Sequence, residues 1–207
     1  MIDTVKIDSN WADKSCAVVV AHPDDETLWA GGTILMHPET KWTIVTLCRR
    51  SDADRRARFF RVLKEYGAEG AMGDLNDGPE QNPLDKELVK NTVTNLLGKA
   101  NFDLVITHGS KGEYTRHLRH EETAEAVADL YRSGLLKADS LWSFAYEDGG
   151  GKYLPHAIEN SDICLQLADD IWQRKYKIIT ELYGFAEESF EARTSPKAEA
   201  FWRIKKT

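Results

Sequence analysis

The stretch that most constrains the fold runs from Val18 to Glu26, where three branched apolar residues and an alanine lead into His-Pro-Asp-Asp-Glu. The apolar run is typical of a buried strand. Pro23 forces the chain out of that strand, because proline cannot donate a backbone hydrogen bond and has a fixed φ angle. The acidic residues suit the positive end of a helix dipole, so we expect a helix from Thr27. The polar cluster then lies at the carboxyl end of a strand, where ligands bind in open α/β sheets.

Strand-like runs and helical patterns alternate along the chain, which predicts a parallel sheet covered on both faces. The expected fold class is α/β, with a Rossmann-like three-layer arrangement and a mostly parallel sheet. The length of 207 residues, without repeats or linkers, predicts one domain over residues 1–207. Strands are expected over 16–21, 42–47, 69–72, 103–107, 141–146 and 163–167, and helices over 27–37, 54–66, 84–97, up to 131, 168–183 and 196–204.

Composition limits the classes of function. The net charge of −7 disfavours nonspecific binding of nucleic acid, and the apolar stretches are too short for a membrane span. The first residues are acidic and lack the apolar core of a signal peptide, which predicts a cytoplasmic protein. Cys16, Cys48 and Cys164 are widely spaced and predict neither a disulfide framework nor a metal clip. The sequence leaves open whether the protein forms a homo-oligomer.

Polar loops follow several of the predicted strands. Right-handed crossovers place the carboxyl ends of parallel strands on one rim of the sheet. That rim would carry the segments 22–26, 48–52, 74–77 and 108–120. Loops that are far apart in the sequence are therefore expected to converge.

His22 and Asp25 are three residues apart across a turn, close enough to bind one ion. An imidazole and a carboxylate suit zinc, and also iron, cobalt or manganese. A catalytic zinc site has a third protein ligand and an open position. The best candidate for that ligand is His120.

His117 and His120 share the helical spacing of Ala124, Val127 and Tyr131, so both histidines are expected on an inward helix face. The two glutamates that follow His120 are expected to point away. An inward histidine is more often a hydrogen-bonded core residue, and His-x-x-His recurs by chance. The adjacent carboxylates at 24 and 25 are more specific, because their repulsion calls for a cation or a proton.

The run Ala21-His22-Pro23-Asp24-Asp25-Glu26, with a downstream His-x-x-His, resembles the LmbE-like (PIG-L) deacetylases. The resemblance extends to Tyr-Gly at 66–67, Asn-Asp-Gly at 76–78 and Val-Ile-Thr-His at 105–108. It covers roughly residues 16–127, and the C-terminal part only loosely. It implies a hydrolase that removes an acetyl group from an amino sugar, with Zn²⁺ or another divalent transition metal such as Fe²⁺ as cofactor.

The resemblance also implies a role for each matching residue. Asp24 matches the general base and, beside a ligand, can take the proton of an activated water. His117 matches the histidine that stabilises the oxyanion, for which a cationic ring would be favourable. The implied metal ligands are His22, Asp25 and His120.

Substrate-binding residues are expected on the same rim. The resemblance implies that Arg55 and Asp77 contact substrate, and Tyr114 is a candidate for lining the pocket. A solvated helix face for Arg55 and ordinary turn chemistry for Asp77 stay open as alternatives. The family often has aspartate directly before the last histidine. Here that residue is Arg119, which we expect to be exposed and to alter the charge of the rim.

The expected partner is therefore a small N-acetylated sugar or glycoconjugate of the N-acetylglucosamine type. Two other functions stay open at this point. One is a metal hydrolase of another small amide or ester, and the other is a non-catalytic sugar-binding protein of the same fold.

Overall fold

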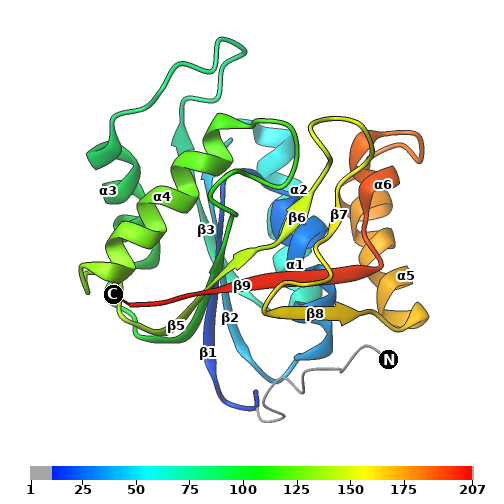
Figure 1. Ribbon diagram of the computed structural model, residues 1–207, viewed down its shortest axis with the longest axis horizontal. Helices are drawn as coiled ribbons and strands as arrows, with labels where there is room; N and C mark the ends of the chain where they lie inside the picture. The colour runs from blue at the N-terminus through cyan, green and yellow to red at the C-terminus, as the bar shows by residue number, and fades with distance from the viewer. Residues whose placement is uncertain (1–10, 207) are drawn as a thin grey trace.

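The computed structural model describes residues 11–206 and contains a seven-stranded sheet (Figure 1). The strand order is β3-β2-β1-β4-β5-β9-β8. The first five strands are parallel, whereas β9 pairs antiparallel with both β5 and β8. The predicted α/β class with a mostly parallel sheet is confirmed. The segment in which we expected no signal peptide lies outside the described residues.

Most elements differ from their predicted bounds by only a few residues. The strands are β1 (Ser15–Val20), β2 (Lys41–Cys48), β3 (Glu69–Leu75), β4 (Phe102–Thr107), β5 (Ala138–Phe144), β6 (Tyr146–Glu147), β7 (His156–Ala157), β8 (Ile163–Gln166) and β9 (Ala198–Ile204). The helices are α1 (Asp25–Met36), α2 (Ala53–Tyr66), α3 (Lys86–Leu97), α4 (Leu118–Arg132), α5 (Asp169–Lys177), the π-helix η1 (Ile178–Leu182) and α6 (Phe190–Thr194).

The predicted helix at 196–204 is wrong, because these residues form strand β9. Alanine and glutamate favour helices, and this composition misled the sequence-based prediction. In the structure, Glu199 and Phe201 are fully buried and belong to the layer that packs against α1. Because β9 lies between β5 and β8, ladder hydrogen bonds on both edges outweigh local propensity.

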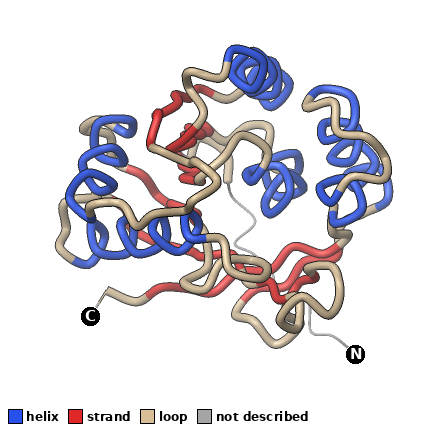
Figure 2. Tube along the Cα trace, turned by 90° about the horizontal axis from the view of Figure 1, so that it is seen from above, coloured by secondary structure: helices blue, strands red, loops and turns tan. Residues whose placement is uncertain are grey.

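Helices lie on both sides of the sheet (Figure 2). On one face α1, α2 and α5 enclose a core that includes Trp29, Phe59 and Ile179. On the other face α3 and α4 pack against each other and bury Val93 and Val127. Within residues 11–206, none of the helices has both the length and the apolar character needed to cross a membrane.

A buried ion pair joins α5 to β9, and the same carboxylate ties α1 to β9. Lys175 donates to Glu199 at 2.8 Å, and both side chains are fully buried. The Glu199 carboxylate also accepts the backbone N–H groups of Gly32 and Thr33, each at 2.7 Å. A Cβ atom at Gly32 would lie 2.4 Å from a terminal methyl carbon of Leu167, so a larger residue there would force that side chain to move. The contact fixes the helix whose N-terminus carries the acidic motif.

The order of the strands reverses at β1, which lies between β2 and β4. In doubly wound folds, ligands bind outside the carboxyl ends of the strands at this switch point. His22 follows β1 by two residues, and His108 directly follows β4. The fold therefore brings the first histidine motif and the segment before α4 to one edge of the sheet.

Candidate active site

The three predicted metal ligands point their donor atoms at one another. His22 Nδ1 lies 3.2 Å from Asp25 Oδ2, His120 Nε2 lies 3.4 Å from the same oxygen, and the two ring nitrogens are 3.3 Å apart. Ligand atoms at 2.0–2.1 Å from a tetrahedral zinc ion are spaced by about 3.3 Å. The spacing and the chemistry of these donors therefore fit one ion of this size.

Asp24 has an unusual backbone conformation. Its φ of 115° lies in a region that L side chains rarely adopt and that costs about 1–3 kcal/mol. The Asp24 N–H donates to Glu26 Oε2 at 3.0 Å, which holds this conformation. The turn directs the Asp24 side chain into the pocket beside Asp25.

The environment of Asp24 favours its protonated form more than water does. Burial raises the pKa of Asp24 well above its usual range, and the charge of Asp25 raises it further. The Arg55 guanidinium, 3.3 Å from Asp24 Oδ2, opposes this shift. A carboxylate with a raised pKa accepts a proton more readily than one with an ordinary pKa.

The buried carboxylate of Glu26 stabilises the turn at Asp24, a role that the sequence did not reveal. It accepts hydrogen bonds from the Thr27 hydroxyl and the Tyr183 hydroxyl, both at 2.6 Å, in addition to the Asp24 N–H. Tyr183 directly follows η1 and is 157 residues away in the sequence. Spacing within the motif carries no signal for such a distant partner.

Glu113 orients His120, a role that was also not predicted from the sequence. Its Oε2 accepts hydrogen bonds from Nδ1 of His120 at 2.7 Å and Nδ1 of His108 at 2.8 Å, and its Oε1 accepts the Gly109 N–H. Burial alone would raise the pKa of Glu113, but the two histidines lower it to about 2. A carboxylate on Nδ1 leaves Nε2 of His120 free for a metal, as in many zinc sites. His108 accepts the Ala21 N–H at 2.9 Å, so both its ring nitrogens have protein partners.

His117 is the N-cap residue of α4 and lies just outside the helix, so its predicted position on the helix face is wrong. Its ring still stacks on His120, with centroids 4.5 Å apart, and lines the pocket. Burial, with the charges of His120 and His22, lowers the pKa of His117 to about 4. The ring is neutral at neutral pH, contrary to the favourable cationic form considered from the sequence, and can act as an N–H donor.

Asp77 lies behind His22. Its Oδ2 is 3.2 Å from His22 Nε2 and 2.5 Å from Arg49 Nη2, and its Oδ1 accepts Gln81 Nε2 at 3.0 Å. Burial opposes ionisation, but the hydrogen bond and charge of His22, with Gln81 and Arg49, lower the pKa of Asp77. Because Asp77 also lines the pocket, it faces both a candidate ligand and the space for substrate.

Arg119 is buried, so the expectation of an exposed rim residue is wrong. Only 3% of its surface is exposed. Its guanidinium donates to the backbone oxygens of Asn76 at 2.6 Å and Asn82 at 2.8 Å, and pairs with Glu122. Glu122 points toward Arg119 and the Leu84 N–H rather than toward His120. The hydrogen bonds from Arg119 to these backbone oxygens connect the loop that carries Asp77 with the first turn of α4.

These residues enclose a small pocket of about 150 Å³. Arg55 and Tyr114, both predicted from the sequence, line it. Phe190 and Glu191 come from α6, and the sequence did not indicate them. The lining residues are His22, Pro23, Asp24, Asp25, Leu28, Arg49, Arg55, Asp77, Tyr114, His117, Phe190 and Glu191.

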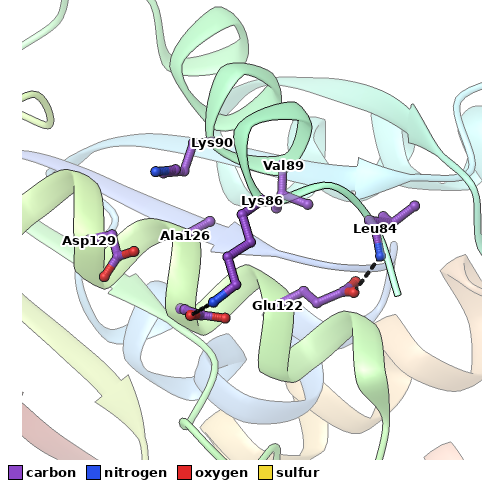
Figure 3. Close-up of a pocket in the computed structure, with 8 residues that line it drawn as sticks. Leu84, Lys86, Val89, Lys90, Glu122, Ala126 and Asp129 are labelled. Atoms are coloured by element: carbon purple, nitrogen blue, oxygen red, sulfur yellow. Dashed lines mark hydrogen bonds and ion pairs between the residues drawn. The ribbon is translucent and has the colours of Figure 1, made fainter. Parts of the chain in front are cut away.

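A second, small pocket lies between α3 and α4 (Figure 3). Lys86 pairs there with Glu125, and Glu122 accepts the Leu84 N–H at 2.7 Å. These charged groups are bonded to partners within the pocket itself. The predicted site residues lie elsewhere, so this pocket is not the candidate active site.

The family model of PIG-L, described as GlcNAc-PI de-N-acetylase, matches residues 17–131, which is more than half of the chain. The chain belongs to the PIG-L family. Membership supports a deacetylase of the LmbE type and therefore a hydrolase. The matched residues include the whole acidic motif and both histidines of the His-x-x-His pair.

The known proteins that resemble this PIG-L protein have names that give different activities or no activity. Uncharacterized protein L374 of Acanthamoeba polyphaga mimivirus is 23% identical over 190 residues, covering 85% of this chain and 77% of the relative. The crystal structure of GalB, the 4-carboxy-2-hydroxymuconate hydratase from Pseudomonas putida KT2440, matches with a TM-score of 0.64 at 17% identity, covering 93% of this chain and 96% of that one. The A40926 pseudoaglycone deacetylase Dbv21 matches with a TM-score of 0.64 at 15% identity, covering 93% and 98%. At these identities the solved structures show a shared fold.

Proposed function

We propose that this PIG-L protein is a metal-dependent N-deacetylase that hydrolyses the acetamide of an amino sugar or glycoconjugate of the N-acetylglucosamine type. The observation that carries the proposal is the triangle of donor atoms from His22, Asp25 and His120, spaced by 3.2–3.4 Å. Asp24 and His117 border the same pocket. This combination supplies a cation site, a base and an N–H donor within one small cavity.

His22, Asp25 and His120 would hold the ion. The two-nitrogen, one-oxygen donor set suits Zn²⁺, and Fe²⁺ is an alternative because it accepts the same ligand types. A bound ion of this kind lowers the pKa of water toward about 7 and polarises an acyl carbonyl. Glu113 and Asp77 support the proposal because each places a carboxylate on the far side of a ligand histidine.

The residues of the pocket would divide the proton transfers between them. Asp24 takes a proton from the attacking water as the new C–O bond forms, and passes it to the nitrogen as the C–N bond breaks. His117, as a neutral ring, donates an N–H to the oxygen on which negative charge develops. Arg55 holds Asp24 in place through the contact at 3.3 Å.

The outer part of the pocket would bind the sugar. Asp77 and Arg55 offer an acceptor and a donor to sugar hydroxyls, and Tyr114 offers a ring face at the mouth. Arg49 and Glu191 add a further donor and acceptor. Polar groups spaced around a small cavity are suited to a ligand with several hydroxyls.

The test is acetate release from a panel of N-acetylated amino sugars by the metal-loaded protein and by Asp24→Asn. We expect release by the wild type and a kcat lowered about 10²–10⁴-fold in the variant, with unchanged metal content. Asp139→Asn, an exposed acid on β5, is the matched control and should behave as wild type. Stoichiometric metal without acetate release would favour a non-catalytic sugar-binding protein.

The fold alone does not select the reaction, since GalB is named as a hydratase. A water-activating site can add water to a C=C bond as well as cleave an amide. Family membership favours deacetylation. Assays of simple amide and ester substrates, and of enol acids for hydration, would detect the other reactions. Turnover of any of these without acetate release from amino sugars would contradict the proposed substrate class.

A further inference from the structure

A groove continues from the candidate active site past Tyr114 and Phe190, whose side chains line both spaces. The two rings pack edge to face with centroids 5.0 Å apart. The other walls come from the loop that joins β6 to β7 and from α6, which lie at the same end of the molecule (Figure 1). A substrate that is longer than one amino sugar would therefore extend from the pocket into this groove.

The β6–β7 loop is fastened to the segment that carries the catalytic histidine. Asp148 Oδ2 accepts the backbone N–H and the hydroxyl of Thr115, each at 2.5 Å, and Oδ1 accepts the Gly150 N–H at 2.9 Å. Gly151 has a φ of +80°, and a Cβ there would lie 3.0 Å from the Thr115 hydroxyl, so glycine allows the loop to approach. The groove thus has a fixed position relative to His117, two residues after Thr115.

Three aromatic rings contribute to the lining of the groove. The described part of the chain has five exposed large hydrophobic side chains, and two of them, Tyr153 at 45% and Phe190 at 39%, lie here. Tyr114 adds a third ring, and Leu154 and Pro155 add apolar surface. Exposed apolar side chains that gather in one place mark binding sites, and aromatic ligands stack well on such rings.

The free charges of the groove are positive, although the whole chain carries a net charge of −7. Lys152 and Arg193 line the groove, and within residues 11–206 neither forms an ion pair. Asp148, the acid of the groove, uses its carboxylate to hold the loop. Glu191, from the same helix as Arg193, lines the catalytic pocket instead.

We propose that this groove is a second subsite, which binds the part of the substrate that is linked to the amino sugar, and that this part is an aromatic ring bearing an anionic group. The rings of Tyr114, Tyr153 and Phe190 stack on the aromatic part, and Lys152 and Arg193 pair with the anion. This inference rests on the proposed deacetylase function, because it names the substrate class of the same site.

The experiment compares the methyl, phenyl and 4-carboxyphenyl glycosides of N-acetyl-β-D-glucosamine, with kcat/KM for acetate release as the readout. We expect an increase of about fivefold from methyl to phenyl and a similar increase from phenyl to carboxyphenyl. Tyr153→Ala should reduce the first ratio, and Arg193→Gln combined with Lys152→Gln should reduce the second to about one. The controls Leu135→Ala and Lys99→Gln, exposed and away from the groove, should keep both ratios.

Binding of the same three glycosides to metal-loaded Asp24→Asn, measured by calorimetry, separates the subsite from the reaction. Tighter binding of the carboxyphenyl glycoside, lost in the Arg193→Gln and Lys152→Gln variant, supports the subsite even when acetate release is absent and the proposed reaction fails. Acetate release at equal kcat/KM from all three glycosides, or equal affinities, overturns the subsite and leaves the deacetylase proposal standing. A preference that persists in the groove variants also overturns it.

Discussion

The pocket has a floor, formed by the turn at Asp24 and the rings of His117 and His120, and an outer wall, formed by α6. These two parts are built differently. On the floor, the buried carboxylates of Glu26 and Glu113 each accept three hydrogen bonds and fix the turn at Asp24 and the ring of His120. On the wall, Phe190 is 39% exposed and lies on α6, a helix of only five residues. The difference indicates that the floor determines the reaction, whereas the wall can change with substrate without disturbing it.

Among the variants that compare the floor with the wall, the largest effect is expected from His117, whose ring stacks on His120. His117→Ala should lower kcat about 10²–10³-fold, because it removes the N–H donor to the developing oxyanion. A ring nitrogen of His117 also lies within 4.8 Å of ring nitrogens of His22 and His120. Because the proposal assigns the third ligand position to Asp25, KM and the metal content should change little. The readouts are steady-state kinetics and metal content per chain.

His156→Ala is the matched control, because His156 is an exposed histidine on β7. It should leave kcat unchanged. Loss of metal together with activity in His117→Ala would instead indicate that His117 is a metal ligand. The proposed assignment of the metal ligands would then be wrong.

An intermediate effect is expected from Glu113, which acts through His120. Glu113→Gln should weaken metal affinity about 10–100-fold, because a neutral amide holds the ring less firmly and lowers its basicity. A chelator competition titration measures this affinity. Glu121→Gln, which alters a nearby glutamate paired with Arg116, should keep the wild-type value. Equal affinities for both variants would show that the contact at 2.7 Å does not tune the metal site.

The smallest effect is expected from the wall. Phe190→Ala should raise KM about three- to tenfold with little change in kcat, because it removes a ring contact that is equally present before and during the reaction. Phe60→Ala, an exposed phenylalanine on α2, is the control. A large fall in kcat for Phe190→Ala would erase the distinction between floor and wall.

The sequence predicted the parallel part of the fold well because its signals are local. Buried strands such as Val18–Val20 and the helix that ends at Gly67 carry their own apolar and capping patterns. The segment from Ala198 lacked such a pattern, because its strand character depends on pairing with β5 and β8. Propensity alone therefore favoured the wrong element there.

The residues of the candidate site also fall into two groups, those that local spacing and topology predicted and those that depend on distant contacts. His22 and Asp25 lie close because three residues separate them, and topology predicted that the loop with His120 reaches the same rim. The contacts of Tyr183 with Glu26 and of Phe190 with Tyr114 join segments more than seventy residues apart. Single-sequence spacing contains no signal for such pairs, and Arg119 was misplaced because its partners lie on a distant loop.

The most direct test is the metal content of the wild type and of His120→Ala after reconstitution with zinc and removal of loosely bound metal. If His22, Asp25 and His120 hold the ion, the wild type retains about one zinc ion per chain and releases acetate, whereas His120→Ala retains almost none and is inactive. Equal zinc occupancy in the two proteins, or acetate release by wild-type protein stripped of metal, would contradict the proposed metal site.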